Sequence, residues 1–260
     1  VFIKALEAES ASGDTDPDSY AETLTITGKD GLQLIGIGRG LAQGGQPQLR
    51  IGAGSTAMIT VNSFGVGIHN LTINGASSTG GGIKLVANGS TADAGGTVIS
   101  GCHFKNCKAS AAAATGGAIY WTSDGGAWYV TIRDCEFYDC RAGIVLIGTS
   151  VSAPKGVKIL NCRFWANVNT TVDADVYAGG SGFADLFMDG NVHGTVDVPA
   201  YATSPTAARY IKLLGGAGII ANGKFACTGK TFGATGDGCI IPTTTRMASC
   251  HQENAIITRT

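Results

Sequence analysis

Six side chains suited to contacting a ligand recur at matching positions of three similar segments. Residues 99–104, 132–137 and 159–164 read ISGCHF, IRDCEF and ILNCRF. The outward residues of these segments and of their continuations are His103, Glu136 and Arg163 in one row, and Lys105, Tyr138 and Trp165 in the next. Aromatic rings can stack on sugar rings while charges bind hydroxyls or uronates, and Tyr, Trp and Arg are also enriched in protein interfaces. The six residues predict a saccharide contact or a subunit contact, and a stripe that is solvated or covered by a loop is the third interpretation.

Five of the eight cysteines repeat with the same spacing. Cys102, Cys135 and Cys162 take the fourth position of the three segments, and Cys107 and Cys140 share a position five residues later. Free cysteine is among the most buried residue types, so the pattern predicts a stacked ladder of interior thiols. Disulfides between stacked residues are the alternative. No metal site is predicted, because C-x4-C without a nearby second pair of ligands is a poor match to structural zinc sites.

The remaining cysteines considered for pairing lie near the C-terminus. Cys227, Cys239 and Cys250 follow the last copy of the repeat described below. Three cysteines in a segment with weak core signal suggest one disulfide and one odd thiol, and the odd thiol could pair between molecules. The sequence does not specify which two residues pair.

Paired carboxylates are the usual machinery of glycoside hydrolysis, which makes Asp134 and Asp189 candidates. Both stand at the third position of their segments, where Asn161 and Asn222 occur in other copies, so a structural role at a corner explains them more simply. The sequence contains no readable cluster of calcium-binding acids with a nearby base. No catalytic residue and no cofactor is predicted, and an enzyme is not favoured.

The elements that would position these residues follow from an internal repeat. Seven copies of a six-residue unit succeed one another at spacings of 27 to 36 residues. Their first residues are all apolar: Leu32, Ile68, Ile99, Ile132, Ile159, Phe187 and Ile220. Their sixth residues are apolar as well: Ile37, Ile73, Phe104, Phe137, Phe164, Val192 and Phe225. A repeat of this length is typical of solenoids.

The third position of the unit specifies a corner. It holds Asn, Asp or Gly in six of the seven copies, with Leu34 as the exception. These residue types tolerate the left-handed backbone that a sharp bend needs. Further strands are expected over 82–87, 118–121, 143–147 and 210–214. The sequence therefore predicts an all-β fold, a right-handed single-stranded parallel β-helix of about seven coils, and an antiparallel sandwich is the less favoured alternative.

Domain organisation and partners follow from the repeat and the composition. We expect a β-helix over 1–225 and a short irregular, cysteine-containing segment over 226–260 that caps the helix or serves in assembly. The net charge of −1 and the lack of a basic run disfavour nucleic acid as a partner. No apolar stretch is long enough to span a membrane. The first six residues already read as a strand, so we expect a segment upstream of Val1.

The opening segments, YAETLTI over 20–26 and LQLIGIG over 32–38, resemble the first coils of right-handed β-helix proteins of the pectin-lyase-like superfamily. That superfamily includes polysaccharide lyases and hydrolases, surface adhesins, and the tail spikes and fibres of bacteriophages. Its virion members are often trimers. The resemblance marks a fold shared by several functions rather than one activity.

The resemblance and the lack of a readable catalytic cluster favour a virion protein. The expected role is structural or host-interacting, as a tail spike, fibre or capsid decoration, in a virion or extracellular setting. Expected partners are further copies in a homotrimer or other virion proteins, with cell-surface polysaccharide as a ligand. An extracellular polysaccharide lyase or glycoside hydrolase is the first alternative. A bacterial adhesin or carbohydrate-binding module is the second.

Overall fold

The structure is a computed structural model in which all regular secondary structure of the described residues is β-strand. The described residues are 1–4, 19–20, 22–38, 46–51, 57–75, 81–86, 93–108, 116–121, 127–148, 153–165, 174–180, 183–194, 210–226, 239–253 and 257–259.

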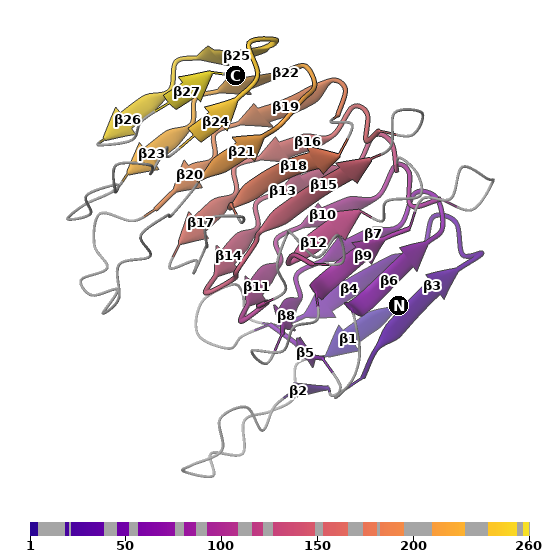
Figure 1. Cartoon of the computed structure of the whole chain (residues 1–260). Coiled ribbons are helices and arrows are strands. Elements are labelled where there is room, and N and C mark those ends of the chain that lie inside the picture. Colours follow the sequence, from indigo (N-terminus) through magenta and orange to yellow (C-terminus); the bar gives the residue numbers. More distant parts are fainter. Residues whose placement is uncertain are drawn as a thin grey trace, which may run out of the picture.

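Three parallel sheets run along the length of a β-solenoid (Figure 1), and each has nine strands within the described residues. Sheet A contains β1 (Phe2–Lys4), β4 (Gln33–Ile37), β7 (Gly67–His69), β10 (Val98–Ser100), β13 (Thr131–Arg133), β16 (Lys158–Leu160), β19 (Leu186–Asp189), β22 (Gly218–Ala221) and β25 (Thr245–Ala248). Sheet B contains β2 (Ser19–Tyr20), β5 (Gln48–Arg50), β8 (Thr72–Asn74), β11 (His103–Lys105), β14 (Glu136–Tyr138), β17 (Arg163–Trp165), β20 (Val192–His193), β23 (Lys224–Ala226) and β26 (His251–Glu253). Sheet C contains β3 (Leu24–Thr27), β6 (Ala57–Asn62), β9 (Gly81–Leu85), β12 (Ile119–Trp121), β15 (Ile144–Gly148), β18 (Val176–Gly180), β21 (Ile211–Leu213), β24 (Cys239–Ile241) and β27 (Ile257–Arg259). At about 4.8 Å per stacked strand, the solenoid is on the order of 40 Å long.

The core consists of side chains stacked on their equivalents in the neighbouring coils. Ile99, Ile132 and Ile159 pair in register along sheet A and are fully buried. Phe104, Phe137 and Phe164 do the same along sheet B, with ring centroids 4.9 and 4.6 Å apart and nearly parallel planes. Because alternate residues of a strand point to opposite faces, the neighbours of these residues face outward.

The corners between sheets A and B have the predicted residue types and the predicted left-handed backbone. Left-handed backbone occurs at one residue of each turn: Asn70, Gly101, Asp134, Asn161, Gly190, Asn222 and Ser249. The amide of each of the first six residues donates to a carbonyl oxygen of the next coil, as in Asp134 N to Leu160 O at 3.0 Å. Asn, Asp and Gly accept this conformation at low cost, so the repeat of corner residues fixes where every coil bends.

Two copies of the repeat lie in a different register from the one predicted. In the copy at 187–192, Met188 rather than Phe187 pairs with Ile159, and the corner is Gly190 rather than Asp189. As a result His193, not Val192, faces the core. The physical reason is that Asp189 and Gly190 both suit a corner, and glycine adopts the left-handed conformation more readily.

In the first copy, the predicted inward and corner positions are also wrong. Leu34 pairs with Ile68 and is buried, so it is a core residue rather than a corner residue. Ile37 is exposed. Position 34 holds none of the residue types Asn, Asp or Gly that favour a bend, and β4 runs through it as one continuous strand.

The solenoid continues beyond the seven predicted coils at both ends. Strands β1 to β3 precede the first full repeat, and β24 to β27 extend all three sheets after residue 226. The expectation of an irregular tail over 226–260 is therefore wrong for the residues described there. Its proposed capping or assembly role stays a prediction.

Candidate functional site

The six outward residues singled out in the sequence are brought together on the outer face of sheet B. His103 pairs with Glu136 and Glu136 with Arg163, while Lys105 pairs with Tyr138 and Tyr138 with Trp165, in three successive strands. We call this set of six residues the sheet B stripe. The structure places them in the two predicted rows, and their role in binding stays a prediction.

The aromatic row of the stripe is closely packed. The rings of Tyr138 and Trp165 have centroids 4.5 Å apart and are tilted by 48°. His103, in the neighbouring row, lies 6.5 Å from the Tyr138 ring. Tyr138, Trp165 and His103 are all half-buried, so edges and parts of the ring faces remain accessible. Tilted aromatic neighbours hold each other in fixed orientations, which suits a preformed contact surface.

Polar groups flank these rings. Arg163 Nη1 lies 3.4 Å from Glu136 Oε1, with 57% of the arginine and 24% of the glutamate side chain exposed. An exposed ion pair of this length contributes little to stability, so both groups can exchange it for contacts with a ligand. His103 Nε2 and Trp165 Nε1 are buried and have no hydrogen-bond partner among the described residues. The stripe thus combines ring surface with the charges of Arg163, Glu136 and Lys105.

His103 is held toward its neutral form. Desolvation is the largest influence and lowers the pKa of His103, Glu136 raises it, and Lys105 lowers it. Above pH 6.5 His103 is therefore a neutral, half-buried ring of the stripe rather than a cation.

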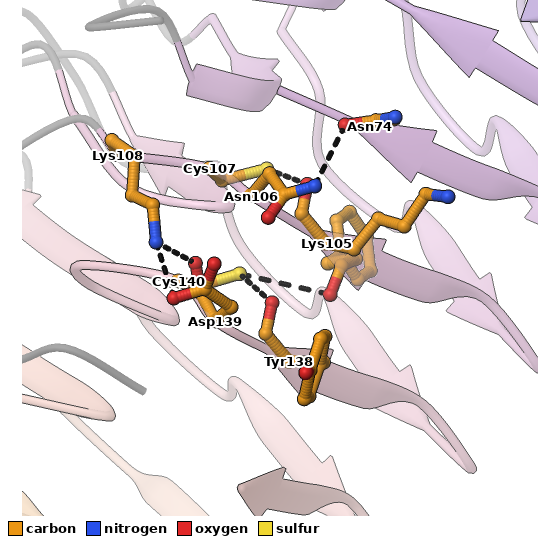
Figure 2. Close-up of polar contacts among 9 residues, drawn as sticks. Asn74, Lys105, Asn106, Cys107, Lys108, Tyr138, Asp139 and Cys140 are labelled. Carbon is orange, nitrogen blue, oxygen red and sulfur yellow. Dashed lines mark hydrogen bonds and ion pairs between the residues drawn. The ribbon is translucent and has the colours of Figure 1, made fainter. Parts of the chain in front are cut away.

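The bend that follows the stripe is fixed by a polar cluster (Figure 2). Lys108 Nζ donates to the backbone oxygen of Asp139 at 2.8 Å and forms an ion pair with the Asp139 carboxylate. Asn106 and Asp139 have left-handed backbone, and Asn106 Nδ2 donates to Asn74 Oδ1 at 3.4 Å. Beside them, Cys140 Sγ donates to the carbonyl oxygens of Phe104 and Tyr138. These contacts hold the ends of β11 and β14 and so orient Lys105 and Tyr138.

The cysteine ladder is present as reduced thiols. Cys102, Cys135 and Cys162 are buried and free, as are Cys107 and Cys140. Each of the first three Sγ atoms donates to carbonyl oxygens at the corner, such as Cys135 Sγ to Arg133 O at 3.2 Å. Burial raises the pKa of Cys135 and of Cys140 well above the ordinary range. These thiols are core groups that also satisfy corner carbonyls.

The C-terminal cysteines take similar positions. Cys239 stacks on Ile211 in sheet C and is buried, and Cys250 Sγ donates to Ile220 O at 3.6 Å. Both are free thiols. Cys227 lies outside the described residues, so a disulfide that involves it stays a prediction.

The candidate carboxylates are not gathered into one group. Asp134 occupies a corner, as predicted, and Asp189 ends strand β19 and accepts a hydrogen bond from Asn222 Nδ2 at 2.8 Å. Asp139 is bound to Lys108, and Asp185 occupies a corner ahead of β19. No group of three His, Cys, Asp or Glu residues suited to a metal ion occurs in the described part of the chain.

Sequence reasoning missed a buried polar pair. His193 Nδ1 lies 3.0 Å from Asp175 Oδ2, and both residues are buried. The His193 ring is stacked between Phe164 and Phe225, with centroids 4.6 and 5.1 Å away. Its Nε2 has no hydrogen-bond partner among the described residues. The sequence allows the corner at Asp189 or at Gly190. Placing it at Gly190 shifts the following strand by one position and turns His193 toward the core.

Comparison with known proteins supports the fold through solved structures. No protein family model and no curated protein matches the chain. Among solved structures, the chain is similar to ORF18 of Geobacillus virus E2, with a TM-score of 0.66 and 13% sequence identity. The match covers 96% of this chain and 44% of that chain, so this chain spans less than half of that protein's length. At this identity the likeness shows a shared β-solenoid fold. Among the described residues there is also no helix long and apolar enough to cross a membrane.

Proposed function

We propose that this chain is the β-solenoid body of a virion structural protein, of the tail-spike, tail-fibre or capsid-decoration kind, located in the virion or at the cell exterior. The observation that carries the proposal is the fold likeness to a viral open reading frame over 96% of this chain. The resemblance of the opening coils to the pectin-lyase-like superfamily, which includes phage appendages, supports the same assignment. The proposed partners are further copies of the chain, as a homotrimer, or other virion proteins.

Within this role, the sheet B stripe is proposed to contact cell-surface polysaccharide. Tyr138 and Trp165 offer tilted ring surfaces, and Arg163 and Glu136 offer charges beside them. The centre of a protein interface is usually apolar and poor in charge, whereas the half-buried rings of the stripe stand beside the charges of Arg163 and Glu136. Partial ring faces flanked by polar groups are better suited to a sugar, whose surface alternates C–H and O–H groups.

The placement of the acids supports a binding role rather than polysaccharide cleavage. Asp134 and Asp185 hold left-handed corners, Asp139 pairs with Lys108, and Asp175 lies buried against His193. Each of these carboxylates has a local structural role in the fold.

The saccharide contact is tested by binding of the purified chain to an immobilised panel of neutral and acidic bacterial polysaccharides. We expect at least one to bind, with affinity reduced about tenfold or more by Trp165→Ala and by Tyr138→Ala. Trp128→Ala, which removes an exposed indole from a different face, is the matched control and should leave binding unchanged. Absence of binding across the panel, or an equal loss in the control, would overturn the saccharide contact.

The virion assignment and the non-catalytic role have separate tests. Peptides of this chain should be found by mass spectrometry in purified, nuclease-treated virus particles, and their absence from intact particles would overturn the assignment. The same polysaccharide panel should release no reducing or unsaturated sugar ends. Sugar release that is abolished by substitution of a single Asp or Arg would instead identify a lyase or hydrolase.

A further inference from the structure

Three polar side chains on the outer side of sheet A are joined by two hydrogen bonds. Gln33, His69 and Ser100 lie on the successive strands β4, β7 and β10. His69 Nδ1 is 2.7 Å from Ser100 Oγ, and His69 Nε2 is 2.9 Å from Gln33 Oε1. A hydroxyl bonded to an imidazole that a third side chain orients is the arrangement that activates a serine as a nucleophile.

The direction of both hydrogen bonds follows from the orientation of Gln33. Its Nε2 donates to the carbonyl oxygen of Gly31 at 3.2 Å, so its Oε1 is the atom that faces His69. An amide oxygen only accepts hydrogen bonds, which places the proton of the neutral His69 ring on Nε2. Nδ1 then carries a lone pair and accepts the hydroxyl proton of Ser100. Ser100 is thus bonded to the atom that can take up its proton.

The strand beneath these side chains leaves room for them at Gly67. This residue pairs with Gln33, and a Cβ added to it would collide with Gln33 Oε1 and His69 Nε2. Gly67 does not have positive φ, so its backbone conformation does not require glycine. The lack of a side chain at this position instead lets the amide and the imidazole meet.

The hydrogen-bonded group is not part of the repeating architecture. Structural features of this solenoid recur coil after coil, as the corner residues and the cysteines do. The outward row that contains His69 and Ser100 changes character in the following strands, and the Gln33–His69–Ser100 arrangement does not recur among the described residues. After Ser100 the row continues with Arg133, Leu160, Asp189, Ala221 and Ala248. Stacking of the coils therefore does not require this group.

The charges around His69 suit a general base. Gln33, Ile35 and Ser100 on the adjacent strands are uncharged, whereas Arg133 follows Ser100 in register and is exposed. Desolvation lowers the pKa of His69, and the positive charge of Arg133 lowers it further. The imidazole is therefore neutral above pH 6.5 and able to accept a proton. Arg133 also offers a positive charge beside Ser100, where the oxygen of an attacked carbonyl group would become negative.

We infer that Ser100, His69 and Gln33 form an esterase site that hydrolyses acyl esters. Ser100 Oγ attacks the ester carbonyl carbon and passes its proton to His69 Nδ1, while the carbonyl oxygen becomes an oxyanion beside Arg133. The bond to the alcohol oxygen then breaks, and His69 gives the proton to this leaving group, so that Ser100 retains the acyl group. A water molecule next gives a proton to His69 Nδ1 and attacks the acyl carbon, which releases the carboxylic acid and returns the proton to Ser100. Ester and water are thus converted to alcohol and acid without a cofactor.

The chemistry of the site favours esters over amides. Gln33 is a neutral orienting group, so it stabilises a protonated imidazole less than the carboxylate of a Ser-His-Asp triad does. An ester has the better leaving group and needs less help from the protonated base. Gln33 is exposed and the other two residues are half-buried, so the site is open to an acyl group that projects from a large polymer.

The position of the site indicates which polymer would carry the ester. Ser100 and His103 of the sheet B stripe belong to the same coil, on the two sides of the corner at Gly101. A saccharide that lies along the stripe would bring its O-acyl groups to this corner. The choice of an O-acylated saccharide rests on the proposed saccharide contact, whereas the esterase site itself does not. Removal of acyl groups leaves the sugar chain uncut, in keeping with the binding role proposed for the stripe.

The experiment is hydrolysis of para-nitrophenyl acetate by the whole chain at neutral pH. We expect a rate above that of buffer, with kcat/KM reduced about 100-fold or more by Ser100→Ala and by His69→Gln. An acetyl group should be found by mass spectrometry on the peptide that contains Ser100 after the reaction is stopped with acid. Thr131→Ala, which removes an outward hydroxyl from the neighbouring strand β13, is the matched control and should leave the rate unchanged.

The positioning role of Gln33 has its own readout. Gln33→Glu should raise the pKa of His69, because a carboxylate favours the protonated imidazole, and should move the acid limb of the kcat/KM profile to higher pH. Gly67→Ala should lower kcat by separating the two side chains. A Gln33→Glu variant with an unmoved pH profile would show that Gln33 does not orient the base.

Three outcomes would overturn the esterase site. They are hydrolysis no faster than in buffer, hydrolysis unaffected by Ser100→Ala, and an equal loss in the Thr131→Ala control. Thermal melting by circular dichroism accompanies each variant, so that unfolding is not counted as loss of activity.

The saccharide substrate is tested separately, by release of acetate from O-acetylated members of the polysaccharide panel. Release that is lost in Ser100→Ala would support it. Hydrolysis of the small ester without release of acetate from any polysaccharide would overturn the substrate class and leave the esterase site in place. Hydrolysis of the small ester by a chain that binds no polysaccharide would count against the sheet B stripe only.

Discussion

The outer faces of sheets A and B are carried by the same coils but expose different chemistry. Beneath both, the same kind of ladder fills the core, with Ile132 in sheet A and Phe137 in sheet B stacked in register and fully buried. Above them, the middle strands of sheet A expose the charged residues Arg133 and Lys158, whereas sheet B exposes parts of rings beside an ion pair. The inward residues are dictated by the fold. The outward residues are not, so differences between the two outer faces report on what each face contacts.

The largest expected effect tests whether the cores under the two faces are equivalent. Ile132→Asp and Phe137→Asp each place an unpaired carboxylate in the interior, which should cost more than about 5 kcal/mol, as much as the whole stability of a domain at the lower end of the usual range of about 5 to 15 kcal/mol. Both variants should lose the cooperative transition in urea followed by circular dichroism. A cooperatively folded variant at either position would show that its strand is assigned to the wrong register.

The next effect concerns His193, the polar residue within the stack of phenylalanine rings under sheet B. His193→Phe would continue the phenylalanine stack but separate the buried Asp175 carboxylate from its histidine, which should cost about 3 kcal/mol. Adding Asp175→Asn should restore most of this loss, because it removes the buried charge. Urea midpoints of the single and double variants provide the measurement. A double variant no more stable than the single one would mean that the pair is not coupled.

A smaller effect, of opposite sign, is expected at Tyr129, which has a φ of 59° in the turn that leads from sheet C into sheet A. Tyr129→Gly should raise the free energy of unfolding by up to about 1 kcal/mol, because glycine adopts positive φ without strain but loses more entropy on folding. Trp128→Ala, at the adjacent exposed position with ordinary backbone, should give no such gain. Both are read from thermal melts of the dilute chain, and a destabilised Tyr129→Gly would show that the ring contributes packing.

The pH dependence compares one histidine from each face. Desolvation is the main cause that lowers the pKa of His69 on sheet A and of His103 on sheet B below 6.5. Just below pH 6.5 the unfolded chain therefore binds more protons than the folded chain. The free energy of unfolding is highest above pH 6.5, and it falls as the pH is lowered toward the folded-state pKa values of the two histidines. Imidazole resonances followed by NMR should titrate below 6.5 for both residues. A value above 6.5 for His103 would mean that Glu136 outweighs desolvation.

The smallest effect is expected at the ion pair of the sheet B stripe. Glu136→Ala should change the free energy of unfolding by no more than about 0.5 kcal/mol, since the pair with Arg163 is exposed and 3.4 Å long. Urea unfolding gives the comparison with Ile132→Asp. A large loss at Glu136 would contradict the outward assignment of the stripe.

The repeat allowed the sheets, the A–B corners and the cysteine ladder to be predicted, because each depends on a residue that recurs once per coil. Prediction failed where two adjacent residues satisfied the same rule. Phe187 and Met188 are both apolar, and Asp189 and Gly190 both suit a corner, so the sequence did not distinguish the two registers. The consequence was that buried His193 went unnoticed.

The outer faces were harder to anticipate than the core. Tyr120 and Ile219 are both outward and apolar, yet one is covered and the other exposed. Tyr120 packs with Ala57, Ala142 and Val145, and the spacing of the repeat does not specify such contacts between outward side chains. The sheet B stripe was found because its outward residues differ in chemistry from coil to coil.

The reduced cysteine ladder gives the molecule internal reporters of uncoiling. In a solenoid each coil contacts only its neighbours, so coils can open separately and most easily at the ends. A buried thiol with a raised pKa reacts with an alkylating reagent only after its coil has opened. Cys102, Cys135 and Cys162 mark three successive middle coils, and the buried Cys239 marks a coil near the C-terminal end. The order in which these four thiols are labelled would trace, coil by coil, the path along which the rod comes apart.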